Sequence, residues 1–256
     1  MEQKNVPIPL EEFPAELHPF LAGAEFRDSS WHSNARTFYV PPDYYLKIDE
    51  QGELEREAGM GKWFFRHGLG PEVVMSLSRD RDYLLTRRAP GETALAFLDK
   101  PEELCRALAG ALQELHGISP AGLPCSARLE RYRASANDPD GGYWDESVLM
   151  PEFPISSRAE AWDMMQKNRH RLRQDTLIHG DFCLPNVILK QGRFSALIDL
   201  GLAGAGDRHI DLYWAVWTLR HYLKTGRYID EFLRLYGTDR FDYDMLRVVA
   251  AFECFG

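Results

Sequence analysis

The hydrophobic pattern of this chain changes once, at Ala89-Pro90-Gly91. Before this point, short runs alternate between apolar and polar residues and are separated by turn residues, which is typical of paired strands. One stretch, 52–65, instead has helical spacing. The strands are predicted at 37–40, 44–48, 73–77 and 83–86. The first 89 residues therefore predict a small lobe of strands with one helix.

After Gly91 the pattern is mainly helical. Between Pro101 and His116, apolar residues recur every three or four positions, which indicates an amphipathic helix. Further helices are predicted at 158–174, 209–224, 228–236 and 242–255, and a hairpin at 187–190 and 194–198. The sequence thus predicts an α+β protein with two domains, a β-rich one at 1–89 and a larger, mainly helical one at 90–256.

Composition narrows the classes of partner. The net charge of −9 argues against nucleic acid, whose binding needs a basic surface, and suits a cationic small molecule. The first residues lack the apolar stretch of a signal peptide, and no apolar run approaches the ~20 residues of a membrane span. The four cysteines are scattered, so neither a zinc site nor a disulfide framework is indicated. We therefore expect a cytoplasmic protein with reduced thiols and no membrane partner.

Three polar residues have a spacing with chemical meaning. Asp181 and Asn186 are five positions apart, and the predicted hairpin then leads to Asp199-Leu200-Gly201. The same order, Asp-x4-Asn followed by Asp-apolar-Gly, forms the catalytic and metal loops of kinases. Any one of these residues alone is most often a turn or cap residue. Their combination predicts phosphoryl transfer, in which a carboxylate orients the attacking hydroxyl and oxygen ligands hold Mg²⁺.

The residues around this motif point to a family. The segments Ile178 to Val187 and Phe194 to Gly201 closely resemble the aminoglycoside 3'-phosphotransferases, and Ala205 to Asp211 resembles their continuation. The resemblance spans nearly the whole chain. It implies a bilobal protein-kinase-like fold with a nucleotide-binding lobe at 1–89 and a catalytic and substrate-binding lobe at 90–256.

The resemblance also implies roles for the residues of the motif. Asp181 would be the catalytic carboxylate that faces the substrate hydroxyl, and Asn186 and Asp199 would hold Mg²⁺. Asp211 would anchor the catalytic loop by hydrogen bonds. His179 would support the backbone of the loop rather than transfer protons.

Two charges in the first lobe agree with this assignment. Lys47 lies on a predicted strand, and Glu57 follows on the predicted helix. Kinases pair such a Lys and Glu so that the ammonium is held against the α- and β-phosphates. Either residue alone is more often a solvated surface charge, but their order ahead of Asp181 favours a phosphate-binding pair.

Four further residues resemble the nucleotide contacts of the family. Tyr45 resembles its adenine-stacking aromatic residue, although a β-sheet core residue is an alternative. Ser33 lies where a serine covers the phosphates of the donor, ATP or GTP. Arg87 and Ala89 would offer backbone groups to the adenine.

The acceptor is indicated by acidic residues. The segment 137–157 contains no Lys or Arg, and its Trp144-Asp145 resembles a Trp-Glu element of the family. Glu253 matches another acidic contact. Such carboxylates would hold the ammonium groups of an aminoglycoside, although a run of surface acids can also be a solvated face.

The acceptor shell also departs from the family. Leu202 replaces an Arg that helps to position the end of the chain, and Phe252 and Gly142 replace acidic residues. Two alternatives therefore stay open. One is a kinase of another hydroxyl metabolite, such as choline, homoserine, a sugar or a macrolide, and the other is a nucleotide-binding module without turnover.

Overall fold

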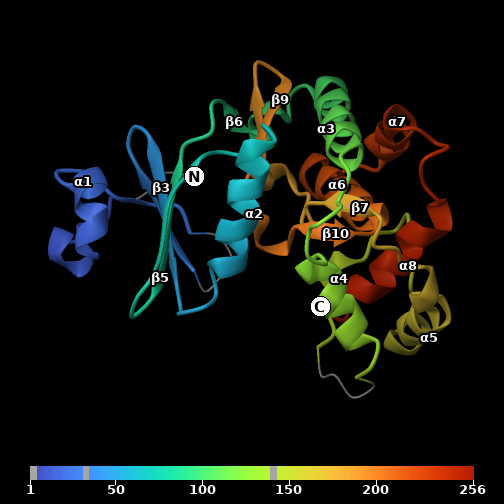
Figure 1. The fold of residues 1–256 in the computed structure, drawn as a ribbon. Helices are drawn as coiled ribbons and strands as arrows, with labels where there is room; N and C mark the ends of the chain where they lie inside the picture. The colour runs from blue at the N-terminus through green and yellow to red at the C-terminus, as the bar shows by residue number, and fades with distance from the viewer. Residues whose placement is uncertain (1–4, 31–34, 139–142) are drawn as a thin grey trace. The chain divides into compact units, whose positions relative to one another are not determined.

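The computed structural model describes residues 5–30, 35–138 and 143–256 (Figure 1). The chain divides into two compact units, Met1–Ala89 and Pro90–Gly256. The boundary between them coincides with the change in hydrophobic pattern at Ala89-Pro90.

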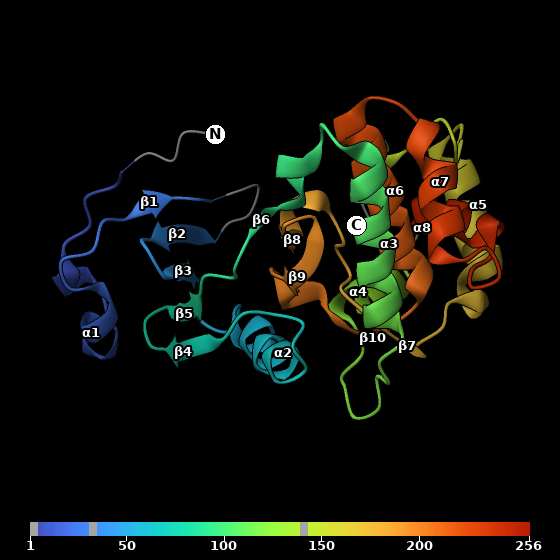
Figure 2. The same cartoon turned by 90° about the horizontal axis from the view of Figure 1, so that it is seen from above.

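The first unit is built on a five-stranded antiparallel sheet in the order β1-β2-β3-β5-β4. Its strands are β1 (Arg27–Asp28), β2 (Arg36–Val40), β3 (Tyr44–Asp49), β4 (Val73–Ser78) and β5 (Asp82–Arg87). Two helices, α1 (His18–Leu21) and α2 (Glu55–Arg66), lie on opposite faces of this sheet (Figure 2). The four predicted strands and the predicted helix are all present.

The alternation of side chains along the strands explains this layering. Leu46 and Ile48 of β3 are buried in a large apolar cluster with the N-terminal segment, which includes Leu17 and Leu21. Lys47 lies between them, so its side chain points to the opposite face of the sheet. That face carries α2, and the first unit therefore brings Lys47 towards this helix.

The second unit is mainly helical. Its helices are α3 (Pro101–His116), α4 (Ala127–Ser135), α5 (Arg158–Asn168), α6 (Arg208–Leu223), α7 (Arg227–Tyr236) and α8 (Tyr243–Glu253). The predicted apolar face of α3 is confirmed, because the five apolar residues that form it are all buried. They are Leu104, Leu108, Ala111, Leu112 and Leu115. This helix packs against α7 and α6 (Figures 1 and 2).

Short strands support the loops of the second unit. β6 (Glu92–Thr93), β8 (Val187–Lys190) and β9 (Arg193–Leu197) form one sheet, and β7 (Thr176–Ile178) pairs with β10 (Gly204–Gly206). The predicted hairpin β8–β9 turns at Gln191-Gly192, where both residues have positive φ. This is the backbone that a two-residue hairpin turn requires. The described part of this unit also contains five short 3₁₀ turns, Ala94–Phe97, Glu146–Val148, Arg169–Arg171, Leu184–Asn186 and Leu200–Leu202.

Three helices differ from the prediction, and one of them is the short α1 of the first unit, which is absent from it. The α-helix predicted at 158–174 ends at Asn168, and the segment continues as a 3₁₀ turn over Arg169–Arg171. The helix α4 is absent from the prediction. Its sequence is rich in Arg and has few apolar positions, so it lacks the periodicity that identifies a helix.

The sequence predicts neither a membrane span nor a disulfide framework. Across the residues that the structure describes, we find no helix with the length and apolarity that a bilayer crossing requires. All four cysteines lie within the described ranges, and no disulfide joins them.

Candidate active site

The site of the second unit begins where β7 ends, at His179-Gly180-Asp181. Gly180 has a φ of +83°, a left-handed conformation that favours glycine. A Cβ atom at this position would lie 2.4 Å from the carbonyl oxygen of Leu202. The loop therefore needs glycine both for its backbone conformation and for its close approach to the segment after Asp199.

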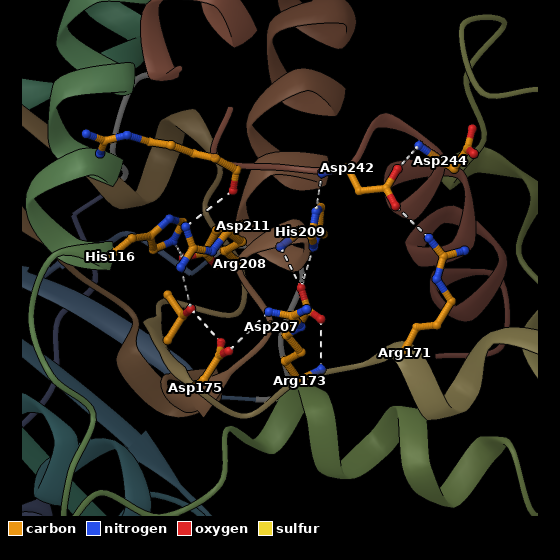
Figure 3. Close-up of polar contacts among 12 residues, drawn as sticks. His116, Arg171, Arg173, Asp175, Asp207, Arg208, His209, Asp211, Asp242 and Asp244 are labelled. Carbon is orange, nitrogen blue, oxygen red and sulfur yellow. Dashed lines mark hydrogen bonds and ion pairs between the residues drawn. The ribbon is translucent and has the colours of Figure 1, made fainter. Parts of the chain in front are cut away.

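Asp211 fixes the path of this loop. Its side chain is fully buried on α6, and its two carboxylate oxygens accept the N–H groups of His179 and Gly180, both at 2.8 Å. The Nε2 atom of His116 lies 3.2 Å from the same carboxylate (Figure 3), and its Nδ1 atom is 2.8 Å from the hydroxyl of Tyr236. The predicted anchoring of the loop by Asp211 is thus present.

His179 links the loop to the end of β9. Its Nδ1 atom accepts the N–H of Asp181 at 3.2 Å, so the ring proton resides on Nε2, which donates to the carbonyl of Ile198 at 2.8 Å. Ile198 directly precedes Asp199. Since both ring nitrogens are engaged with backbone, His179 supports the loop, as predicted.

The carboxylate of Asp181 is held by two side chains of its own loop. The amide nitrogen of Asn186 lies 3.0 Å from Oδ2 and 3.0 Å from the backbone oxygen of Asp181. The Sγ atom of Cys183 lies 3.3 Å from Oδ1. Burial, followed by the charge of Asp181, raises the pKa of the Cys183 thiol well above its ordinary value, so the thiol keeps its proton and donates it.

Asp199 lies beside this group through a backbone contact. The N–H of Ile198 donates to the carbonyl of Asn186 at 3.0 Å, which places the end of β9 against the loop. Asp199 itself has a φ of +59°. A left-handed non-glycine residue costs of order 1–3 kcal/mol and is a frequent feature of functional sites. The structure thus joins Asp181 to Asn186 directly and places the backbone next to Asp199 against the same loop.

The first unit contains the predicted pair of charges. The Nζ atom of Lys47 on β3 lies 2.7 Å from the Oε2 atom of Glu57 on α2. Their side chains are 18% and 12% exposed, so the pair is largely protected from water. A hydrogen bond between two charged groups is stronger than one between neutral groups, so Glu57 orients the ammonium of Lys47.

The other predicted nucleotide contacts lie along the same sheet. The Tyr45 ring is half-buried, 5.0 Å from the ring of Tyr39, and burial raises the pKa of its phenol. Arg87 ends β5, and its guanidinium donates to Glu72 at 3.0 Å, while Ala89 is buried. Ser33 lies outside the described residues, as does Gly142.

The two predicted acceptor contacts differ in their surroundings. Asp145 is half-buried, and one of its oxygens accepts the N–H of Ser147 at 2.8 Å at the start of the turn Glu146–Val148. The hydroxyl and N–H of Ser147 hold the pKa of Asp145 below its ordinary value, so its carboxylate is charged at neutral pH. Glu253 is buried, and three donors of the second unit occupy its carboxylate.

Some contacts around the loop are missing from the sequence prediction. Arg128 on α4 and Cys183 in the loop itself contact the loop, and His116 on α3 contacts its anchor, Asp211. Cys183 lies inside the motif, so its position next to Asp181 was the available signal. His116 and Arg128 are remote in sequence from the loop and belong to no recognisable motif, so their contacts emerge only from the fold.

Comparison with known proteins agrees with this geometry. The model of the phosphotransferase enzyme family matches residues 16–249. The chain is 39% identical over 258 residues to a probable aminoglycoside 3'-phosphotransferase of Lactococcus lactis, covering 99% of this chain and 98% of the relative. The chain belongs to this phosphotransferase family. The resemblance recognised from the catalytic motif is therefore confirmed.

Solved structures support the fold of this phosphotransferase. An aminoglycoside phosphotransferase from Streptomyces rimosus matches with a TM-score of 0.71 and 22% identity, over 97% of this chain and 99% of the other. An aminoglycoside 3'-phosphotransferase of type VIII matches with a TM-score of 0.70 and 21% identity, over 94% and 97%. The predicted α+β, protein-kinase-like fold is confirmed, with its small β-rich and larger helical lobes.

Proposed function

We propose that this phosphotransferase moves the γ-phosphate of ATP or GTP to a hydroxyl of an aminoglycoside or a similar amino sugar, with Mg²⁺ as the metal. The observation that carries the proposal is the fixed carboxylate of Asp181, held by Asn186 and Cys183 on a loop that Asp211 anchors. The full-length similarity to a probable aminoglycoside 3'-phosphotransferase supports the choice of acceptor. The donor would be met in the cytoplasm, the location expected from the sequence.

Asp181 would act on the acceptor hydroxyl. The acceptor oxygen forms a bond to the γ-phosphorus, the bond from this phosphorus to the bridging oxygen breaks, and the nucleoside diphosphate leaves. The hydroxyl proton passes to the Asp181 carboxylate. Because the transition state of phosphoryl transfer is loose, the carboxylate contributes mainly by orienting the hydroxyl, and its orientation depends on the two hydrogen bonds from its own loop.

The residues present fit a magnesium ion. The amide nitrogen of Asn186 is directed at Asp181, which turns its amide oxygen away from that carboxylate. An amide oxygen and the carboxylate of Asp199 are hard oxygen ligands of the kind that Mg²⁺ prefers. We propose that these two residues hold the ion, which when bound neutralises charge on the donor phosphates.

The donor contacts that we propose lie in the first unit. Lys47, oriented by Glu57, would bind the α- and β-phosphates. Tyr45 would stack on the adenine, the backbone of Arg87 and Ala89 would bind its edge, and Ser33 would cover the phosphates. A related Streptomyces rimosus enzyme was solved in complex with ADP and streptomycin, which supports a nucleotide donor.

Asp145 is the acceptor contact that we propose on the second unit. Its carboxylate is charged at neutral pH, and one of its oxygens is used to cap the turn Glu146–Val148. The exposed Glu146 follows it directly. Ammonium groups of an aminoglycoside would be attracted by these two charges and by the net charge of −9, with an affinity that decreases with salt.

The test is a panel of aminoglycosides incubated with Mg²⁺ and either ATP or GTP, with the products measured by mass spectrometry. Wild type is compared with Asp181→Asn and with a control, Asp239→Asn, which changes an exposed residue outside the site. We expect one or more aminoglycosides to gain a phosphate with wild type and the control only. Phosphorylation of choline, homoserine, sugars or macrolides alone would refute the acceptor, and nucleotide binding without transfer to any compound would refute the reaction.

A further inference from the structure

Glu253 occupies a closed environment at the end of α8. Its side chain is 1% exposed. One carboxylate oxygen accepts from Trp214 Nε1 at 2.6 Å and from the hydroxyl of Tyr132, and the other accepts from Arg128 Nη1 at 3.1 Å. Three donors from α4 and α6 therefore use this carboxylate. An acceptor ammonium would have to displace a buried donor to reach it, and that donor would be left unsatisfied.

Arg128 connects this carboxylate to the catalytic loop. Its Nε atom donates to the carbonyl of Gly180 at 2.9 Å, and its guanidinium lies 5.2 Å from the ring centre of Trp214. The N–H of the same glycine donates to Asp211 at 2.8 Å. Gly180 is therefore held at both its N–H and its carbonyl, and the next residue is Asp181.

The charges explain why Arg128 needs Glu253. Burial alone would lower the pKa of Arg128, but the acidic groups around it, Glu253 foremost, raise it above its ordinary value. The guanidinium is thus a charged group in a nearly dry environment, where a charge without a partner is very costly. Asp181 is close enough to act on the same guanidinium. Without Glu253, Arg128 would be attracted to the catalytic carboxylate itself.

We propose that Arg128 is a positioning residue of the catalytic loop and that Glu253 is its buried counter-charge, not a ligand of the acceptor. Arg128 holds the carbonyl of Gly180 and so sets the direction in which Asp181 leaves the loop. Glu253, with Tyr132 and Trp214, holds the guanidinium in the position where it can do so. This proposal rests on the proposed function only in that Asp181 is the residue being positioned.

The first test separates positioning from acceptor binding by steady-state kinetics. In Arg128→Met and in Glu253→Gln, we expect kcat to fall by about ten- to a hundredfold, the effect of a small misplacement of reacting groups. The KM for the acceptor should change by less than about threefold, because neither variant removes a contact that binds the acceptor in its ground state. Arg128→Lys retains the charge but cannot reach the Gly180 carbonyl and Glu253 together, so it should be nearly as slow as Arg128→Met while more stable.

The double variant Arg128→Met/Glu253→Gln adds a second criterion. Each single change leaves a buried group without its partner, whereas the double change removes both members of the pair. We expect the double variant to recover thermal stability relative to the single variants without recovering kcat. A Glu253→Gln variant with normal kcat and Tm but an acceptor KM raised about tenfold or more would show that Glu253 binds the acceptor, and would overturn the proposal.

A readout without turnover keeps this proposal distinct from the proposed function. Amide hydrogen exchange is followed in a peptide that contains Gly180 and Asp181, for wild type, Arg128→Met and a control on the exposed side of α4, Arg133→Met. We expect faster exchange in Arg128→Met only, even if no aminoglycoside is phosphorylated by wild type. Unchanged exchange in Arg128→Met would refute the positioning role, whatever the acceptor proves to be.

Discussion

Replacing Asp211 with alanine removes the acceptor of two adjacent backbone amides, those of His179 and Gly180. The Asp211 side chain is fully buried, so water does not take its place without rearrangement. His116 loses one of its two partners at the same time, since its Nε2 atom lies 3.2 Å from the carboxylate and its Nδ1 atom stays with Tyr236. The change therefore acts on the loop that carries Asp181 without touching Asp181 itself.

The expected loss of stability follows from these contacts. A buried donor that loses its acceptor costs about 1–3 kcal/mol, so two amides amount to roughly 2–6 kcal/mol. Asp211→Asn keeps one acceptor oxygen and turns an amide group towards the second N–H. We expect its destabilisation to be about half that of Asp211→Ala, about 1–3 kcal/mol for one unsatisfied amide.

Urea unfolding followed by tryptophan fluorescence measures this difference, because four of the six tryptophans lie in the unit Pro90–Gly256. Asp239→Ala, at an exposed position, serves as the control. Turnover should be lost in parallel, because the anchored loop carries the catalytic carboxylate. An Asp211→Ala variant within about 0.5 kcal/mol of wild type, the range of ordinary surface changes, would refute the anchoring argument.

Three further predictions follow from single contacts. Gly180→Ala should destabilise the protein by about 2 kcal/mol more than Gly122→Ala in thermal unfolding. Both glycines have positive φ, but only a Cβ atom at position 180 would meet Leu202. Equal losses of stability would contradict this. Lys47→Met should reduce kcat/KM for the nucleotide by about a hundredfold in initial-rate assays and leave the KM for the acceptor unchanged. An effect confined to the acceptor would be evidence against Lys47 as a phosphate-binding residue. Against the effect of burial, hydrogen bonds from His209 and Arg173 hold the pKa of Asp207 below its ordinary value (Figure 3). Its contribution to stability is therefore present above the ordinary pKa of an aspartate and is lost as the pH falls through the lowered pKa. The Tm difference between wild type and Asp207→Asn should shrink in acid, and a constant difference would exclude this origin.

The catalytic loop was predictable from sequence because its chemistry is local. Asp181 and Asn186 are separated by five positions, and a hairpin of fixed length delivers Asp199, so spacing alone brings them together. The Lys47–Glu57 pair was predictable for a similar reason. A strand followed at once by the helix that packs on its face leaves few places where the two side chains can meet.

The buried network around Glu253 could not be predicted in this way. Its partner Arg128 is 125 positions away, on a helix that has no clear apolar periodicity. A glutamate is rarely buried, and the resemblance to an acidic contact of the family predicted that this one binds a charged substrate. Only the packing of α4, α6 and α8 shows that its carboxylate is enclosed.

The end of α5 was missed because apolar periodicity does not distinguish an α-helix from a 3₁₀ turn that follows it. The prediction continued the helical pattern to residue 174, but α5 ends at Asn168 and a 3₁₀ turn covers Arg169–Arg171. Such turns are frequent at the C-termini of α-helices.

The most direct test of the central claim compares turnover and nucleotide binding in Asp181→Asn. This change removes the charge of the carboxylate but keeps its size, and it leaves Lys47 and Glu57 intact. We predict that phosphate transfer to the best aminoglycoside of the panel falls by about a thousandfold or more, while the Kd for the nucleotide changes by less than about threefold. Turnover within about tenfold of wild type would contradict the assignment of Asp181 as the catalytic carboxylate.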